Sequence, residues 1–315
     1  MNKIFTLGEI LVEIMATEIG QSFRRPGTLI GPYASGAPAI FIDQVAKLGQ
    51  AAGMIGCVGE DDFGRLNIER LQRDGVDTRH IHTLKQAVTG SAFVTYHADG
   101  ERDFIFNITN SASAQLAATH VTEEALRDCT HFHVMGSSLF SFRIIDAMKK
   151  AIDLVKAKGG TVSFDPNIRK EMLRIPEMRE ALTYILEFTD IFLPSGHEVS
   201  LLTEAASEAE AVAELLAMGV REVVIKRGAH GSTYFDAQQR IDAPAYAVQE
   251  LDPTGAGDCF GATYVTSRLR GLDVGQSLAY ANAAGALGVT RKGPMEGTSS
   301  YAELDDFMNQ AQVAA

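Results

Sequence analysis

Short apolar runs alternate with longer amphipathic stretches along most of the chain. Five of the runs are rich in β-branched or aromatic residues and are predicted to be buried strands: 54–58, 132–135, 161–164, 191–193 and 223–225. Strands of a parallel sheet that is covered on both faces have this nearly continuous apolar pattern. The alternation therefore predicts an α/β fold with a mainly parallel sheet.

Three amphipathic stretches that flank these strands have the spacing of helices. Their apolar positions are Phe41, Val45 and Leu48; Ile145, Met148, Ile152 and Val155; and Val212, Leu215 and Leu216. Each stretch is followed by glycine, which commonly ends a helix because it adopts the left-handed conformation without strain. We therefore predict a doubly wound fold, in which helices pack on both faces of the sheet.

Two segments depart from this alternation, residues 10–33 and 88–108. In the second, apolar and polar residues alternate on both sides of an Asp-Gly turn at 99–100, which is typical of a hairpin. We predict that antiparallel strands from both segments form a small sheet over the ligand crevice of the main sheet. Nothing in the sequence resembles a linker or a repeat, so residues 1–315 are predicted to form one domain.

Polar and glycine residues follow three of the predicted strands, at 59–61, 136–138 and 165–167. The carboxyl ends of parallel strands meet at one edge of a sheet, and open α/β sheets bind their ligands there. The sequence therefore predicts a ligand site at this edge.

The charge of the chain restricts its partners. It has 315 residues, with 28 Lys and Arg against 40 Asp and Glu, and a formal net charge of −12. No run of basic residues could follow a nucleic-acid backbone or an anionic membrane, so we expect neither as a partner. An acidic protein that binds an anion needs backbone amides, a few basic side chains or a divalent cation.

The cysteines indicate a reducing compartment. Cys57, Cys129 and Cys259 are few, odd in number and without CxxC spacing, so we predict a cytoplasmic protein. Cys259 has no evident activating neighbour and is interpreted as a buried, inert thiol.

Residues 252–258, DPTGAGD, carry the strongest chemical signal. The glycines permit a tight turn whose amides point to the N-terminus of the apolar, helix-like run at 259–269, which makes an anion site without basic side chains. Asp258 then has two interpretations, an N-terminal helix cap or a general base beside the anion. The spacing G-x-G-x-x-x-G, late in the chain, does not match the dinucleotide fingerprint.

The extended segment DPTGAGDCFGA resembles the C-terminal signature of the ribokinase-like (PfkB) carbohydrate kinases. Further segments resemble that family in the expected order: 35–49, 55–64, 164–169, 224–232 and the Ala-rich stretch around Asn282. The resemblance extends over nearly the whole chain. It implies a doubly wound α/β domain with a small β-sheet lid, the lid being residues 10–33 and 88–108.

The resemblance also implies an activity, the ATP-dependent phosphorylation of a sugar hydroxyl. Asp258 would be the general base, and the amides of Gly255, Ala256 and Gly257 would hold the charge on the transferred phosphoryl group. The other residues that the resemblance assigns are Lys226, Gly228, Gly231 and Asn282 for the nucleotide; Glu13, Gly36 and Asn107 for the sugar; Glu198 for the outer shell of Mg²⁺; and Asp252 and Thr254 for a monovalent cation such as K⁺.

The sequence departs from the family pattern at two positions. Ile40 replaces an Asn that hydrogen-bonds a sugar hydroxyl, and an isoleucine side chain can neither donate nor accept. Ser195 replaces the Asn of the N-x-x-E motif that organises Mg²⁺ and its waters, while Glu198 is retained.

Three further residues have open interpretations. His131 and His133 face the same side of a predicted strand and could bind a metal, but no third ligand is apparent, which favours structural histidines. Arg169 follows a strand in the segment DPNIR and is interpreted either as a surface residue or as a ligand of phosphate or substrate.

The predicted substrate is an uncharged sugar. The chain resembles the branch that contains fructokinases and 2-keto-3-deoxygluconate kinases, and within it the bacterial tagatose kinases most. Ketoacid kinases use a lid arginine for the carboxylate, whereas the corresponding stretch here, 104–108, contains none. A buried carboxylate without a cation is costly, so a neutral ketohexose is favoured.

Alternative functions remain open. They are a 2-keto-3-deoxygluconate kinase and a non-catalytic sugar-binding regulatory protein of the same fold. A nucleoside kinase would need an aromatic clamp for the base, which the sequence does not identify. Because open edges of lid strands pair between subunits in this family, we also expect a homodimer formed through the lid.

Overall fold

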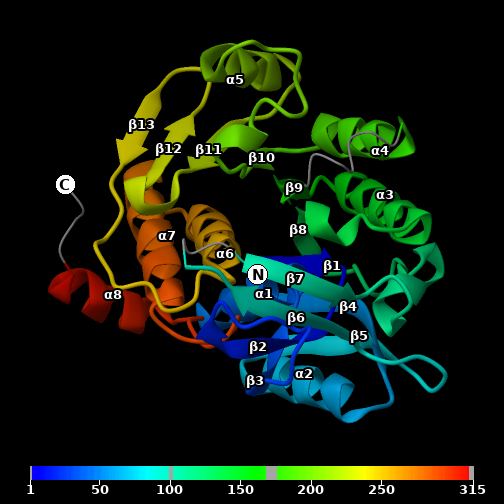
Figure 1. Ribbon diagram of the computed structural model, residues 1–315. Coiled ribbons are helices and arrows are strands. Elements are labelled where there is room, and N and C mark those ends of the chain that lie inside the picture. Colours follow the sequence, from blue (N-terminus) through cyan, green and yellow to red (C-terminus); the bar gives the residue numbers. More distant parts are fainter. Residues whose placement is uncertain (1, 99–101, 168–175, 312–315) are drawn as a thin grey trace.

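The computed structural model describes residues 2–98, 102–167 and 176–311 (Figure 1). Its large sheet has the strand order β13-β12-β11-β10-β9-β8-β1-β4-β5. Neighbours from β5 to β11 are parallel, whereas β12 and β13 are antiparallel. The strands are β1 (Lys3–Leu7), β4 (Ala51–Gly59), β5 (Val76–Leu84), β8 (Cys129–Met135), β9 (Thr161–Asp165), β10 (Ile191–Phe192), β11 (Glu222–Lys226), β12 (Ser232–Phe235) and β13 (Arg240–Ala243).

Helices cover both faces of this sheet, which confirms the doubly wound prediction. They are α1 (Ala37–Lys47), α2 (Asp62–Arg73), α3 (Phe142–Lys156), α4 (Pro176–Glu187), α5 (Glu208–Ala217), α6 (Ala256–Leu269), α7 (Val274–Val289) and α8 (Tyr301–Gln310). One core contains Ile152 of α3 and Leu182 of α4, and the other contains Phe41 of α1 and Tyr264 of α6. Burying each such side chain stabilises the fold by roughly 1.5–3 kcal/mol.

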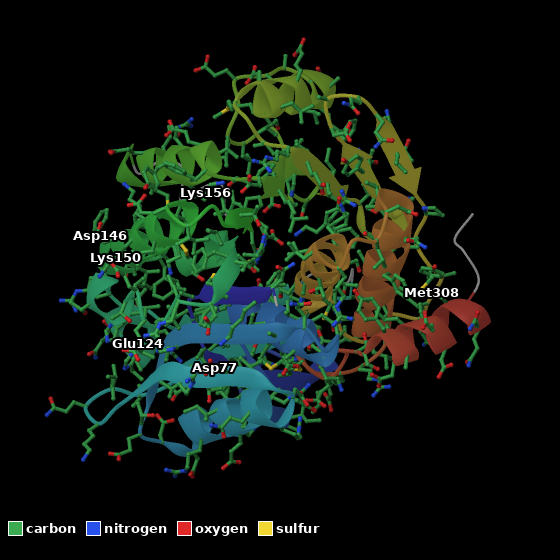
Figure 2. The ribbon with its side chains drawn as sticks, turned by 180° about the vertical axis from the view of Figure 1, so that it is seen from behind. Asp77, Glu124, Asp146, Lys150, Lys156 and Met308 are labelled. Atoms are coloured by element: carbon green, nitrogen blue, oxygen red, sulfur yellow. The ribbon has the colours of Figure 1, made fainter. Side chains whose placement is uncertain are left out.

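The five predicted strands are all present, as β4, β8, β9, β10 and β11, and the three predicted helices are α1, α3 and α5. Two lysines of α3, Lys150 and Lys156, which are labelled in Figure 2, also make polar contacts with neighbouring segments. Lys150 donates to the carbonyl of Ala118 at 2.9 Å, and Lys156 donates to Asp190 at 2.7 Å. None of the helices in the described part of the chain is long and apolar enough to cross a membrane.

The two irregular segments form a second, four-stranded sheet of order β3-β2-β6-β7 (Figure 1). Its strands are β2 (Leu11–Ile19), β3 (Leu29–Ser35), β6 (Gly90–Tyr96) and β7 (Arg102–Asn107). Each segment is an antiparallel hairpin, as predicted, but β2 and β6 pair in parallel. The reason is topological: β2 follows β1 and β6 follows β5, so both leave a parallel sheet at the same edge and in the same direction.

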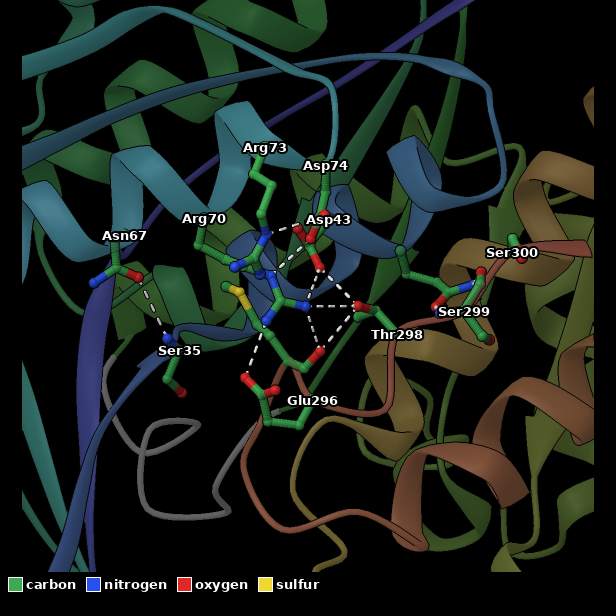
Figure 3. Close-up of polar contacts among 12 residues, drawn as sticks. Ser35, Asp43, Asn67, Arg70, Arg73, Asp74, Glu296, Thr298, Ser299 and Ser300 are labelled. Atoms are coloured by element: carbon green, nitrogen blue, oxygen red, sulfur yellow. Dashed lines mark hydrogen bonds and ion pairs between the residues drawn. The ribbon is translucent and has the colours of Figure 1, made fainter. Parts of the chain in front are cut away.

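A buried cluster of polar side chains joins α1, α2 and the loop before α8 (Figure 3). At its centre, the Arg70 guanidinium pairs with Asp74 at 2.7 Å, Glu296 at 3.0 Å and Asp43 at 3.2 Å. It also donates to the Met295 carbonyl at 2.7 Å. We call these residues, with Thr298, which donates to Asp43 at 2.8 Å, the Arg70 cluster.

Candidate active site

A cavity of about 630 Å³ lies at the carboxyl edge of the large sheet, beside the small sheet. Residues from three regions line it: Glu9, Asp165, Ser195 and Lys226 near strand ends; Glu13, Ser35, Arg102, Phe104 and Phe106 of the small sheet or its entry; and Thr254, Gly255, Gly257 and Asp258. The predicted ligand edge and the DPTGAGD segment therefore meet in one place. Gly36 and Ile40, at the start of α1, also line this cavity.

The turn before α6 is built as the glycine pattern predicts. Gly255 is in the left-handed region at φ +84°, and a Cβ there would lie 2.4 Å from the Pro294 carbonyl oxygen, so only glycine fits. The Ala256 amide is engaged within the turn, donating to the Pro253 carbonyl at 3.4 Å. The first amides of a helix have no intrahelical acceptor, which leaves Gly255 and Gly257 as the better anion donors.

Asp258 lies in the first turn of α6, and its carboxyl group faces the cavity. Gly255, not Asp258, is the N-cap, and no described residue donates a hydrogen bond to the Asp258 carboxyl group. The capping interpretation is therefore wrong. Burial raises the pKa of Asp258 well above its usual range, and the Asp165 carboxylate adds to the rise while Lys226 opposes it. An unpartnered acid in this position can accept a proton from a bound hydroxyl.

Lys226, at the end of β11, donates to Asp165 at the end of β9. Burial alone would lower the pKa of Lys226, but Asp165 and Glu198 raise it above its usual value. Burial raises the pKa of Asp165 to about 6, although Lys226 lowers it. A Cβ on Gly257 would lie 3.6 Å from the Lys226 nitrogen, so this cation stands beside the anion-binding turn.

Asp165 was missing from the predicted site, although its position was informative. Residues 165–167 were predicted to lie at the ligand edge and in a family-like segment, but no role was assigned to Asp165. In the structure one Asp165 oxygen accepts from Lys226, and the other is buried with no hydrogen-bond partner among the described residues. An acid directly after a buried strand at the ligand edge was the signal that could have identified it.

A second cavity, of about 480 Å³, adjoins the first, and Lys226, Pro253 and Gly257 line both. Gly228, Gly231 and Asn282, which were predicted to contact a nucleotide, also line the second cavity. Gly231 is required for packing, because a Cβ would lie 2.0 Å from the Ala243 carbonyl oxygen. The remaining walls are largely apolar and come from α6, α7 and the segment 245–250.

Two glutamates line the first cavity. Glu13, on β2, accepts a hydrogen bond from the Ser35 hydroxyl at 3.3 Å, and burial raises its pKa to about 7. Glu9 accepts from the hydroxyl groups of Ser137 at 2.8 Å and Ser138 at 2.5 Å, and burial raises its pKa too. Glu13 was predicted for the site, whereas Glu9 was missed.

The small sheet contributes an arginine to the cavity that was not among the predicted site residues. The stretch 104–108 contains none, but Arg102, two residues earlier, lines the cavity and donates to the Thr254 hydroxyl at 2.6 Å. The cause is the period of two along β7, which directs Arg102, Phe104 and Phe106 to the cavity. Asn107 is exposed and donates to Ser91 at 3.3 Å, and its contact with the sugar stays a prediction.

The predicted metal-site residues have well-defined surroundings. Glu198 is buried and accepts a hydrogen bond from the Ser195 amide at 2.7 Å. Asp252 is fully buried, and its two oxygens accept from the amides of Thr254 and Gly293, each at 3.1 Å. Arg169 lies outside the described residues.

His131, His133 and Cys259 are buried in the protein interior. The Ser163 hydroxyl lies 2.8 Å from both His131 and His133, and His133 stacks on Phe41 with ring centroids 3.6 Å apart. No group of three potential metal ligands occurs among the described residues. Cys259 is buried, and burial raises the pKa of its thiol, as expected for an inert cysteine.

Comparisons with known proteins match nearly the whole chain. A model of the pfkB family of carbohydrate kinases matches residues 1–300. Fructokinase-1 of Zea mays is 31% identical over 320 residues, covering 98% of each protein. A crystal structure of a provisionally named ribokinase II from E. coli, with ATP and Mg²⁺, is 58% identical with a TM-score of 0.96 and covers 98% of this chain and 100% of that one.

A third comparison concerns a structure with a bound sugar. A fructokinase double mutant from Vibrio cholerae, with fructose, ADP and a potassium ion, is 26% identical with a TM-score of 0.85 and covers 98% of both chains. The TM-scores show that the two solved structures share the fold of this chain. From its sequence and its fold, the chain belongs to the pfkB family of carbohydrate kinases.

Proposed function

We propose that this protein transfers the γ-phosphoryl group of ATP to a hydroxyl group of a neutral ketohexose. The observation that carries the proposal is the Asp258 carboxyl group, which faces the cavity beside the amides of Gly255 and Gly257. Lys226 connects this cavity with the second one. A sugar in the first cavity and a nucleotide in the second would meet at this junction.

The proposed reaction is a direct displacement. Asp258 accepts the proton of the sugar hydroxyl as its oxygen bonds to the γ-phosphorus, and the bond from that phosphorus to the bridging oxygen of ADP breaks. ADP leaves with that electron pair. The amides of Gly255 and Gly257 and the Lys226 ammonium group stabilise the negative charge on the phosphoryl oxygens, with Ala256 contributing less because its amide is engaged.

The second cavity supports a nucleotide as the phosphoryl donor. Gly228 has open space around its Cα on the side of a Cβ, and apolar walls suit an adenine ring. Asn282 points its amide nitrogen at the carbonyl oxygens of Ala243 and Pro244, at 3.3 and 3.1 Å, which fixes its position at the edge of this cavity.

The metal requirement is part of the proposal. The unpartnered oxygen of Asp165 and the nearby Glu198 fit Mg²⁺, which prefers carboxylates and keeps several waters. When bound, Mg²⁺ neutralises charge on the phosphates. We further propose that K⁺ binds near Asp252; the Thr254 hydroxyl already accepts from Arg102, so it is the weaker of the two predicted ligands.

The neutral substrate is supported by the charges around the cavity. Its lining contains the carboxyl groups of Glu9, Glu13, Asp165 and Asp258, and Lys226 is already paired with Asp165. An excess of acceptors suits the donor hydroxyl groups of a polyol better than a carboxylate. Arg102 nevertheless removes the earlier reason for excluding a ketoacid, so 2-keto-3-deoxygluconate remains the alternative substrate.

The first test is ADP formation with Mg-ATP and tagatose, fructose, ribose, 2-keto-3-deoxygluconate or adenosine, with a sugar-free control. Ribose is included because of the name of the E. coli relative, and adenosine because Phe104 and Phe106 give the cavity an aromatic wall. We expect fastest turnover on tagatose or fructose, in line with the tagatose-kinase resemblance. If only the ketoacid is phosphorylated, the proposal of a neutral substrate is wrong and 2-keto-3-deoxygluconate is the substrate.

The second test separates the kinase from a non-catalytic sugar-binding protein. Asp258→Asn keeps the size of the side chain but removes the base, so phosphoryl transfer should fall at least about a hundredfold. Sugar binding, measured by calorimetry, should persist. An unchanged rate would exclude Asp258 as the base, and a wild-type protein that binds sugar without turnover would support the regulatory alternative.

A dimer through the lid is the proposed assembly. The small sheet has β3 and β7 at its edges, and its exposed apolar side chains include Leu29 and Ile30 of β3 and Ile105 of β7. Exposed apolar strands at a sheet edge favour pairing between copies. Light scattering at several concentrations tests this, and a monomer throughout would exclude it.

A further inference from the structure

Two side chains of opposite charge, one from each hairpin of the small sheet, meet at a single hydroxyl group. Arg102 of β7 donates to Thr254 Oγ1 at 2.6 Å. The same hydroxyl lies 3.5 Å from Oε1 of Glu13, on β2, as its donor. The small sheet is thus linked by side chains to the turn that carries Asp258.

The direction of these hydrogen bonds follows from the chemistry of the groups. A guanidinium group only donates, a carboxylate only accepts, and a hydroxyl group has one hydrogen to give. Because Arg102 donates to the Thr254 oxygen, the Thr254 hydrogen is left for Glu13. Ser35 donates to the other Glu13 oxygen at 3.3 Å. Both oxygens of Glu13 are therefore fixed by donors, with lone pairs remaining for a ligand.

The Arg102 side chain is held in place, but most of its N–H donors have no acceptor among the described residues. Its guanidinium carbon lies 5.3 Å from the centre of the Phe104 ring, which supports one face of the group. Within the described ranges it forms no ion pair, and its hydrogen bond to Thr254 is the one its side chain makes. Burial and the nearby Asp252 raise the pKa of Glu13 to about 7, and the charge of Arg102 opposes this rise.

We propose that Arg102 is a positioning residue that orients the Glu13 carboxylate, through Thr254, as the acceptor for a sugar hydroxyl group. The inference rests on the proposed function, because it assigns Glu13 to the sugar. It goes beyond that function by giving the second hairpin of the lid a defined task. Sugar recognition then requires the hairpins of β2 and β7 and the DPTGAGD turn together, joined by the Arg102–Thr254–Glu13 bridge.

The test compares Arg102→Met and Arg102→Lys with a matched control, Arg25→Met, which removes an exposed arginine between β2 and β3. We expect Arg102→Met to raise the sugar KM about tenfold, the size of one charge-assisted hydrogen bond, with kcat changed by less than about threefold. Arg102→Lys should recover part of the loss because it can still donate to Thr254. Arg25→Met should behave as the wild type does.

A double-mutant cycle separates the bridge from a general role in lid stability. Thr254→Val alone should weaken sugar binding, and adding Arg102→Met should cause little further loss, because both changes break the same bridge. Additive losses, or a lysine variant no better than the methionine variant, would overturn the proposal. So would an unchanged sugar KM in Arg102→Met.

Calorimetric titration with fructose and with tagatose, without ATP, keeps this test independent of turnover. If the wild type binds sugar but transfers no phosphoryl group, the proposed function fails while the bridge is still tested by the dissociation constants. A dissociation constant in Arg102→Met within about twofold of the wild type would overturn the bridge alone. A wild type that binds neither sugar would contradict both.

Discussion

Arg70 and Arg102 are both linked to the DPTGAGD turn, but their surroundings differ. Arg70 pairs with three carboxylates and donates to the Met295 carbonyl, next to Pro294, whose oxygen packs on Gly255. Arg102 donates to Thr254 and makes no ion pair in the part of the chain that is described. A guanidinium group whose N–H donors are all hydrogen-bonded to the protein stabilises the fold. One with unpaired N–H donors beside a cavity can bind or orient groups there.

Two buried acids differ in their access to the cavity. One oxygen of Asp43, in the Arg70 cluster, is paired with Arg70 and accepts from Thr298, and the other is buried without a hydrogen-bond partner among the described residues. Asp258 accepts no hydrogen bond from any described residue and faces the cavity. Burial raises the pKa of both. Position at a cavity, more than burial, charge or unmet hydrogen-bonding capacity, therefore separates the candidate catalytic acid from the structural one.

The largest effect that follows from this contrast is on stability. Arg70→Met leaves Asp43 buried without its cation, so the free energy of unfolding in urea should fall by about 3–5 kcal/mol. Arg102→Met should lower it by about 1 kcal/mol or less, as for one hydrogen bond. Equal losses of unfolding free energy in the two variants would contradict the distinction between a structural Arg70 and a cavity-lining Arg102.

Two further variants control that measurement. Arg65→Met, on the same helix as Arg70, removes a side chain that is 61% exposed and should change stability by less than about 0.5 kcal/mol. Asp43→Asn added to Arg70→Met should recover part of the loss, because it removes the uncompensated charge. No recovery would mean that Arg70 acts mainly through the loop carbonyl.

A smaller effect is expected at the turn itself. Gly255→Ala places a Cβ in the left-handed region and against the Pro294 oxygen, which should cost about 1–3 kcal/mol and lower kcat as the turn shifts. Gly257→Ala is the matched control for stability alone, because its Cβ would make only an ordinary contact with Lys226 but would lie at the cavity. Urea unfolding of the two variants tests this, and similar free energies of unfolding would contradict a turn that depends on the φ of Gly255.

The smallest effect concerns pH. Burial raises the pKa of Asp258, and a base acts only when ionised, so kcat should rise with pH through that raised pKa. Below it, kcat should fall up to about tenfold per pH unit, equivalent to about 1.4 kcal/mol. A pH profile of kcat, with circular dichroism at each pH to verify folding, measures this. A kcat that stays constant at acidic pH would show that Asp258 does not accept the proton.

Much of the fold could be predicted because its signals are local. The strands at 54–58 and 223–225 are apolar runs, and the helix with Phe41 and Val45 has a stripe and a glycine stop. The parallel pairing of β2 with β6 could not be predicted from such local patterns. It depends on where two distant strands leave the large sheet, which no window of sequence contains.

The site was predictable where a motif fixes the backbone, as in the turn at 255–258. Lid residues were harder to assign, because the side on which a residue lies depends on the register of its strand. Arg102 lines the cavity and was not assigned, whereas the sugar contact of the exposed Asn107 stays a prediction. Glu9 was missed because its partners, Ser137 and Ser138, are far away in sequence.

The parallel pairing of β2 with β6 has a consequence for folding kinetics. Leu11 pairs with Gly90, and α1, β4, α2 and β5 lie between them in the chain. Closing so long a loop costs entropy, which is recovered only after the intervening elements have assembled on the large sheet. We therefore expect the lid to acquire its structure late in folding and to exchange its amide hydrogens earlier than β1 or β8 in the native state.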